Sequence, residues 1–171
     1  MKTTKRAALT LMAILALSAC SQNEKYDESA ALGANAANGA IVPGSANDPA
    51  SPAYFQASVG DRVLFLVDQS TLTDEARLVL NGQAQWLSTN SDYQAVIEGH
   101  ADEQGTREYN LALGARRANA VREYLVTQGV AASRLKTVTY GKERPIEICS
   151  TESCYAKNRR SVTVLAAGAI S

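Results

Sequence analysis

The 171-residue sequence has little of what most enzymes and membrane-spanning proteins depend on. His100 is the only histidine, only three cysteines occur, and basic residues match acidic ones at seventeen each. The longest apolar run, Ala7 to Leu17, is well short of the roughly 20 residues that a membrane-spanning helix needs. These scarcities argue against a zinc enzyme, a nucleic-acid-binding protein and a membrane-spanning protein.

The N-terminal residues 1–19 are typical of a secretory signal peptide. Lys2, Lys5 and Arg6 precede the short apolar run, and small residues then lead to Cys20. Without this signal, fourteen basic residues remain against seventeen acidic ones, so the exported chain is mildly acidic. We expect an exported protein with no general attraction to nucleic acid.

The segment Leu17-Ser18-Ala19-Cys20 resembles the lipobox of bacterial lipoproteins. The resemblance implies acyl chains on Cys20, and each buried methylene contributes about 0.8 kcal/mol to membrane attachment. Ser21 after the cysteine implies sorting to the outer membrane. The alternative is an ordinary signal peptide followed by an incidental cysteine.

Residues 20–52 are expected to form a flexible tether behind the lipidated cysteine. The segment is rich in Ala, Asn, Gly, Ser and Pro and has no sustained hydrophobic period. Fully stretched, it reaches about 110 Å. The remaining residues, 53–171, are enough for one compact core.

The pattern of residues 53–171 predicts an α+β two-layer sandwich of β-α-β-α-β order with a mixed sheet. Thr73 can cap a helix that runs to about Ser88, and Thr106 can cap a second that ends before Gly129. In the second helix the apolar stripe is Leu111, Gly114, Ala118, Val121 and Leu125, with Arg117 outside it. Strands are expected at residues 62–67, 93–98, 135–140 and, after the cysteine loop, 161–165.

Cys149 and Cys154 stand in a polar, loop-like stretch. In an oxidising exported compartment this pair favours a local disulfide that shapes one loop. Two free thiols, or half of a metal site, are the alternatives. The nearby pair Arg159-Arg160 is expected to be solvated.

One stretch, residues 99–125, combines an acidic loop, a helix start and an arginine pair. If the loop folds back over the helix, Asp102 and Arg117 can face one pocket, and Asn110 lies two turns before Arg117 on the same helix face. Carboxylate, guanidinium and amide would suit a ligand with an ammonium, a carboxylate and a peptide group. The alternative is a structural ion pair between Asp102 and Arg117 that steadies the loop.

The same stretch, GHADEQGTREYNLALGARRANAVREYL, resembles the signature of OmpA-like peptidoglycan-binding domains. Asn158-Arg159-Arg160, the run Tyr140 to Pro145 and the final Ser-Val-Thr-Val segment fit the same family. The resemblance implies that Asp102 and Arg117 hold diaminopimelate of the peptide stem. It also implies that Asp68, near the end of the first strand, helps to shape the pocket.

The resemblance implies an outer-membrane lipoprotein that faces the periplasm and grips peptidoglycan without a covalent bond. It further implies Tol partners, among them the propeller protein TolB, and roles in envelope integrity and in outer-membrane invagination during division. The alternative within the family is an envelope-stapling lipoprotein without Tol partners. No cofactor is expected, and the enzyme or metal reading of Glu98, His100 and Asp102 lacks further ligands and a nucleophile.

Overall fold

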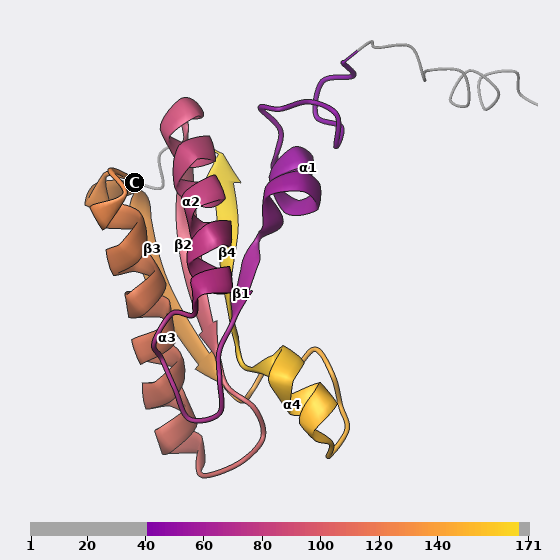
Figure 1. Ribbon diagram of the computed structural model, residues 1–171, viewed down its shortest axis with the longest axis vertical. Helices are drawn as coiled ribbons and strands as arrows, with labels where there is room; N and C mark the ends of the chain where they lie inside the picture. Colours follow the sequence, from indigo (N-terminus) through magenta and orange to yellow (C-terminus); the bar gives the residue numbers. More distant parts are fainter. Residues whose placement is uncertain (1–40, 168–171) are drawn as a thin grey trace, which may run out of the picture. The chain divides into compact units, whose positions relative to one another are not determined.

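The computed structural model describes residues 41–167 as one mixed α and β domain (Figure 1). The predicted signal peptide, Cys20 and residues 21–40 of the predicted tether lie outside the described residues. The elements, in chain order, are α1 (Pro52–Tyr54), η2 (Phe55–Gly60), β1 (Arg62–Leu64), α2 (Asp74–Thr89), β2 (Tyr93–His100), α3 (Arg107–Thr127), η3 (Ala132–Arg134), β3 (Leu135–Gly141), α4 (Glu152–Asn158) and β4 (Arg160–Ala167).

The sheet has the strand order β1-β4-β2-β3. Strands β2 and β3 are parallel and joined by α3, whereas β4 runs antiparallel to both β1 and β2. This is the predicted β-α-β-α-β order closed by a strand after the cysteine loop, and the expected fold class is confirmed. The topology brings the ends of β1, β2 and β3 and the start of β4 to one end of the sheet, the lower end in Figure 1.

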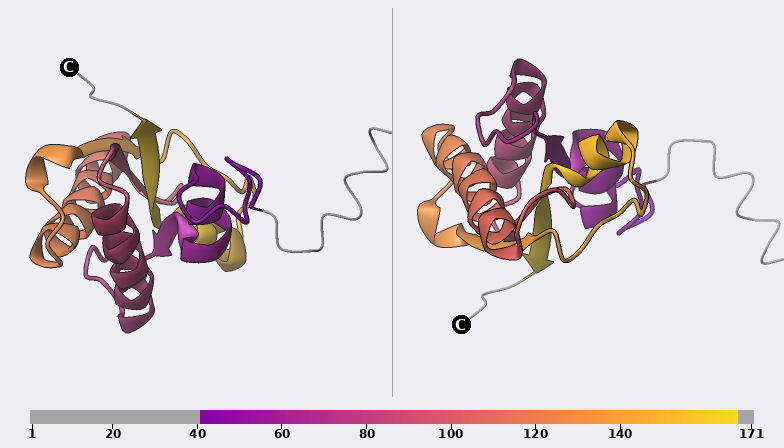
Figure 2. Two further views of the ribbon diagram at one scale, coloured as in Figure 1. Left: turned by 90° about the horizontal axis from the view of Figure 1, so that it is seen from above. Right: turned by 90° about the horizontal axis from the view of Figure 1, so that it is seen from below.

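Helices α2 and α3 lie side by side against one face of the sheet (Figures 1 and 2). Both begin where the sequence predicts, because Thr73 Oγ1 accepts from Ala76 N–H at 3.2 Å and Thr106 Oγ1 from Tyr109 N–H at 3.2 Å. After α3, Gly129 takes a φ of +97°, and Val130 N–H donates to Leu125 O at 3.1 Å. Glycine adopts this left-handed conformation without steric cost, so it ends the helix as predicted.

Strand β1 is shorter than the apolar run that predicts it. Val63 and Phe65 are buried, but Leu64, Leu66 and Val67 are about half exposed. Because β1 is an edge strand with one buried face, the continuous apolar run does not make a fully buried strand. After Leu64 the chain turns into a loop in which Gln69 N–H donates to Leu66 O at 3.2 Å.

The buried face of α3 differs from the predicted stripe. Asn110 and Arg117 are 1% and 0% exposed, and they share this face with Leu113, Gly114, Ala118, Val121 and Leu125. The prediction that Arg117 falls outside the stripe is therefore wrong. Gly114 sits where α3 meets β2, and a Cβ built on it would lie 2.8 Å from Gly99 O.

The folded unit begins at Ile41, before the predicted domain boundary at residue 53. Trp86 Nε1 in α2 donates to Pro49 O at 2.7 Å, and Ser51 is buried and caps α1. Phe55 is fully buried against Trp86, with ring centroids 4.9 Å apart. Residues 49–51, which the sequence assigns to the tether, thus pack on the domain, whereas Ile41 and Val42 are more than half exposed.

Within residues 41–167, no helix has the length and apolar character that crossing a membrane requires.

Candidate functional site

A cavity of about 420 Å³ opens at the end of the sheet where the loops after β1 and β2 meet the first turns of α3. Three of the four ligand residues expected from the sequence line it, namely Asp68, Asp102 and Asn110. Its remaining walls come from Val67, Gln104, Gly105, Tyr109 and Leu113. The cavity therefore combines two carboxylates, an amide and an aromatic ring.

Asp102 lies in the loop after β2 and is 8% exposed. Its Oδ1 accepts from Gln104 N–H at 3.2 Å, and its Oδ2 accepts from Arg159 Nη1 at 3.2 Å. The guanidinium paired with Asp102 is thus that of Arg159, which lies between α4 and β4. Each carboxylate oxygen can accept more than one hydrogen bond, so Asp102 keeps acceptor capacity toward the cavity.

Arg117 lies beneath the cavity and is not part of its lining. Nε donates to Gln69 O at 2.8 Å, Nη1 to His100 O at 2.8 Å and Nη2 to Leu66 O at 3.2 Å. The guanidinium therefore joins the loop after β1 to the end of β2, the two segments that carry Asp68 and Asp102. The sequence left two alternatives, a guanidinium that faces the pocket and a structural ion pair with Asp102. In the described domain Arg117 does not line the cavity, and Asp102 pairs with Arg159 instead.

Burial lowers the pKa of Arg117 to about 10, and the charge of Asp102 opposes this effect. At neutral pH Arg117 remains charged, so it supplies positive potential under two carboxylates. The ring of Phe65 lies 5.2 Å from the guanidinium carbon and covers another side of it.

Asn110 holds the acidic loop as well as lining the cavity. Its Nδ2 donates to Gln104 O at 2.7 Å, so the amide nitrogen is engaged by the loop. The predicted role of this amide toward a peptide group would depend on its oxygen.

Tyr109 is a cavity residue that sequence reasoning missed. Its hydroxyl donates to Asp68 Oδ1 and so links α3 to the loop after β1. This hydrogen bond raises the pKa of Tyr109. Asp68 has a φ of +59°, a left-handed conformation that Asp tolerates better than most residues do. The Tyr-Asn pair in the sequence signature was the available signal for Tyr109.

His100 lies apart from the cavity, at the end of β2. It is 1% exposed, and neither ring nitrogen has a hydrogen-bond partner, although Glu98 Oε2 lies 3.4 Å from Nε2. Burial, together with the charges of Arg160 and Arg144, lowers its pKa to about 4. Within residues 41–167 no group of three or more His, Cys, Asp or Glu side chains is placed to hold a metal ion.

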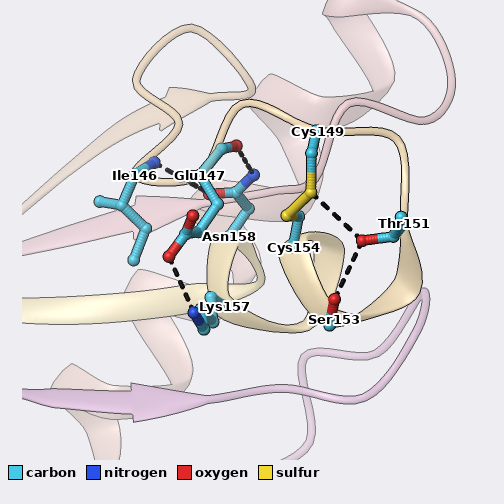
Figure 3. Close-up of a disulfide and its surroundings, with 8 residues drawn as sticks. All are labelled: Ile146, Glu147, Cys149, Thr151, Ser153, Cys154, Lys157 and Asn158. Atoms are coloured by element: carbon cyan, nitrogen blue, oxygen red, sulfur yellow. Dashed lines mark hydrogen bonds and ion pairs between the residues drawn. A yellow bond between two sulfur atoms is a disulfide. The ribbon is translucent and has the colours of Figure 1, made fainter.

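The segment before β4 carries α4, which the sequence did not predict, and a disulfide between Cys149 and Cys154 (Figure 3). The Cα atoms of the two cysteines are 5.9 Å apart. The prediction that Arg159 and Arg160 are solvated is wrong, since each is 4% exposed. Buried cations need partners, and here Asp102, Glu152 and backbone carbonyls supply them.

A second cavity, of about 500 Å³, lies between β1, the start of α2 and Ile146. Its lining is mostly aliphatic, with charged side chains only from Arg62, Glu75 and Lys157. Because the smaller cavity concentrates polar groups from three segments, it is the better candidate for a charged ligand.

Comparison with known proteins gives consistent findings. Residues 64–159 match the OmpA family. The chain is 51% identical over 157 residues to the peptidoglycan-associated lipoprotein of Mesorhizobium japonicum, covering 92% of this chain and 89% of that protein. It is 48% identical over 160 residues to the protein of the same name from Agrobacterium fabrum, covering 93% and 86%.

Among solved structures, the crystal structure of the peptidoglycan-associated lipoprotein from Burkholderia pseudomallei is similar, with a TM-score of 0.63 and 38% identity. The match covers 70% of this chain and 98% of that one.

Proposed function

Since this chain belongs to the OmpA family and, within it, to the peptidoglycan-associated lipoproteins, we propose that it binds peptidoglycan non-covalently through diaminopimelate. It does so as an outer-membrane lipoprotein that faces the periplasm, and it thereby links the outer membrane to the cell wall. The domain works as a binding module and not as an enzyme.

The cavity at the end of the sheet is the observation that carries this proposal. A diaminopimelate residue in a stem peptide presents an ammonium group and a carboxylate. In this proposal Asp102 and Asp68, which both line the cavity, accept hydrogen bonds from the ammonium, and Asn110 contributes to the same wall. A charge-assisted hydrogen bond contributes about 1.5 to 3 kcal/mol, so a few of them give roughly micromolar affinity after the cost of association.

Arg117 serves this site from below. With its three donor nitrogens engaged by carbonyl oxygens, its main contributions are the position of the loops that bear Asp68 and Asp102, and positive charge near the ligand's carboxylate. A direct contact between Arg117 and the ligand would require one of these loops to move. The family resemblance implies that Arg117 contacts the ligand, whereas its buried position implies that it supports the loops. Measurements of the stability of Arg117 variants separate these two roles.

Attachment to the membrane is assigned to acyl chains, palmitate among them, on Cys20. A repetitive polymer can be held by many weak contacts when the binding domain is kept close to it. The lipid anchor supplies this proximity, and mass spectrometry of the N-terminal peptide of the mature chain tests it directly.

As part of a Tol–Pal system, the protein also contacts TolB and other Tol proteins, and it supports envelope integrity and outer-membrane invagination during cell division. TolB and peptidoglycan compete for overlapping surface. Co-purification of TolB with the full chain, and its loss on addition of sacculi, are the expected results. Failure of TolB to bind would leave the alternative of an OmpA-like stapling lipoprotein without Tol partners.

The central test is a pull-down of the detergent-solubilised full chain with purified sacculi. We expect Asp102→Ala and Asp102→Asn to weaken retention by about tenfold or more, because each removes a charge from the cavity. Asp92→Ala is the matched control, since Asp92 is an exposed carboxylate just before β2, at the other end of that strand. Free diaminopimelate should compete with the sacculi. Unchanged retention of the Asp102 variants would reject the assignment.

A further inference from the structure

Asp102 is connected to the disulfide loop by a short chain of charged contacts. Arg159 Nη1 donates to Asp102 Oδ2 at 3.2 Å, and Arg159 Nη2 forms an ion pair with Glu152 at the start of α4. Arg159 Nε donates to Phe65 O at 3.2 Å, and Phe65 N–H donates to Arg159 O at 2.9 Å. The guanidinium is therefore fixed between the cavity wall, the end of β1 and α4.

Glu152 stands inside the ring that the disulfide closes, between Cys149 and Cys154. Thr151 Oγ1 lies 3.2 Å from Cys149 Sγ and 2.9 Å from Ser153 Oγ, so the residues around Glu152 are tied to one another (Figure 3). The Glu152 side chain itself is 66% exposed, and its partner Arg159 is 5% exposed. The Arg159 end of this ion pair is buried, whereas the position of the Glu152 end is set by the loop that the disulfide closes.

The base of the loop is closed independently of the disulfide. Asn158 is fully buried; its Oδ1 accepts from the N–H groups of Ile146 and Glu147 at 2.9 and 3.2 Å, and its Nδ2 donates to Glu147 O at 2.9 Å. Figure 3 shows these bonds on the side of the loop away from the tip. Opening the disulfide would therefore leave this base in place and remove the cross-link on the first turn of α4, which carries Glu152 and is otherwise held by the bonds from Cys154 N–H and Tyr155 N–H to Thr151 O, each 3.0 Å.

We infer that Glu152 is a positioning residue for Asp102, acting through Arg159, and that the disulfide keeps Glu152 in place. The inference rests on the proposed function, because it concerns the strength of ligand binding at Asp102. Glu152 touches no ligand in this scheme.

The physical reason is competition for one guanidinium. Arg159 Nη1 lies 3.2 Å from Asp102 Oδ2 and 3.4 Å from Glu152 Oε2, so the two carboxylates share its charge. When Glu152 is absent, Asp102 faces that charge alone, and the ligand's ammonium must compete with Arg159 for the Asp102 oxygens. An exposed ion pair is weak when both side chains move freely, and a closed ring reduces the freedom of Glu152.

Reduction of the disulfide would weaken the ion pair between Glu152 and Arg159 reversibly. A dithiol donates two electrons and two protons, the S–S bond breaks, two S–H bonds form, and the dithiol is oxidised to its own disulfide. The periplasm-facing protein would then bind peptidoglycan less tightly when reduced than when oxidised.

The test compares Glu152→Gln, Cys149→Ser/Cys154→Ser and the unaltered full chain, with purified sacculi as the probe. We expect sacculus binding to weaken by about three- to fivefold in both variants, as loss of a partly exposed ion pair predicts. Treatment with a dithiol should weaken the unaltered chain to the same extent and leave the double serine variant unchanged. Glu147→Gln is the matched control, because Glu147 pairs with Lys157 at 2.8 Å in the same loop and leaves Arg159 untouched.

A second readout does not depend on peptidoglycan. The Gln104 N–H donates to Asp102 Oδ1, so its NMR chemical shift reports the position of that carboxylate. The shift should move in Glu152→Gln and stay in Glu147→Gln, while the melting temperature of both variants stays close to that of the unaltered chain.

Four outcomes decide the matter. Moved Gln104 shift with weaker binding supports the positioning role. An unchanged Gln104 chemical shift together with unchanged sacculus binding in Glu152→Gln overturns it. Asp102→Ala would still weaken binding in that case, and so uphold the proposed function. Equal effects in Glu147→Gln overturn it as well. If the Gln104 chemical shift moves in Glu152→Gln but the unaltered chain does not bind sacculi, the positioning role of Glu152 is supported and the proposed function is rejected.

Discussion

Replacement of Arg117 by alanine distinguishes two possible roles of its guanidinium, support of the loops around the cavity and direct contact with the ligand. Three hydrogen bonds from a charged donor contribute about 5 to 9 kcal/mol in total when each bond is counted separately. Burial of the guanidinium, which lowers its pKa to about 10, offsets about 3 kcal/mol of this. We therefore expect Arg117→Ala to lower the free energy of unfolding by about 3 kcal/mol, in the range found when one partner of a buried charged pair is removed.

Urea denaturation measures this change. Trp86 is the only tryptophan and is 6% exposed in the core, so its fluorescence follows unfolding of the domain. Arg116→Ala is the matched control, because Arg116 is the preceding residue on α3 and is exposed. It should change the free energy of unfolding by less than about 0.5 kcal/mol. Arg117→Lys keeps the charge but cannot reach three separate carbonyls, and it should fall between alanine and the unaltered chain.

The reasoning fails if Arg117→Ala unfolds at the same urea concentration as the unaltered chain while its sacculus binding drops about tenfold. That result would mean that the guanidinium contacts the ligand directly, as the sequence resemblance implies. Loss of stability together with binding is the outcome that the buried position favours.

Two further predictions concern the frame around the site. Gly114→Ala should destabilise the domain by about 3 kcal/mol or more, because its Cβ would lie 2.8 Å from Gly99 O and force α3 away from β2; thermal unfolding measures this. The pKa of His100 falls from 6.5 to about 4 on folding, so the unfolded chain binds the proton first and stability is lost as pH falls from about 6.5 to 4. The loss should reach about 3 kcal/mol, and pH-dependent denaturation of His100→Gln should lack this component.

Local signals in the sequence predicted the frame of the fold well. The caps Thr73 and Thr106 and the terminating Gly129 each depend on backbone groups within a few residues, so both long helices begin, and α3 ends, where expected. The parallel direction of β2 and β3 could be inferred because a helix between two strands implies a parallel crossover, whereas the insertion of β4 between β1 and β2 could not.

The site was predictable only in part. Asp68, Asp102 and Asn110 reach one cavity because β1 and β2 end, and α3 begins, at the same end of the sheet. The burial of Arg117 and Arg159 could not be read from composition, because it depends on carbonyl groups of the loops after β1 and β2 that are far away in the sequence. Charged residues are expected outside unless such partners are known.

The same limitation explains the domain boundary. Residues 41–52 are mostly small or polar and look like a linker. The indole N–H of Trp86 and the buried ring of Phe55 nevertheless attach the end of this segment, around Pro49, to α2. Neither contact leaves a periodic signal in the sequence.

This attachment has a mechanical consequence. A pull transmitted from the N-terminal side would first load the Phe55 and Trp86 rings and the Pro49 carbonyl, and only afterwards the three-residue pairing of β1 with β4. The aromatic contact would thus bear such a load before the short edge strand does, and before the loop that carries Asp68.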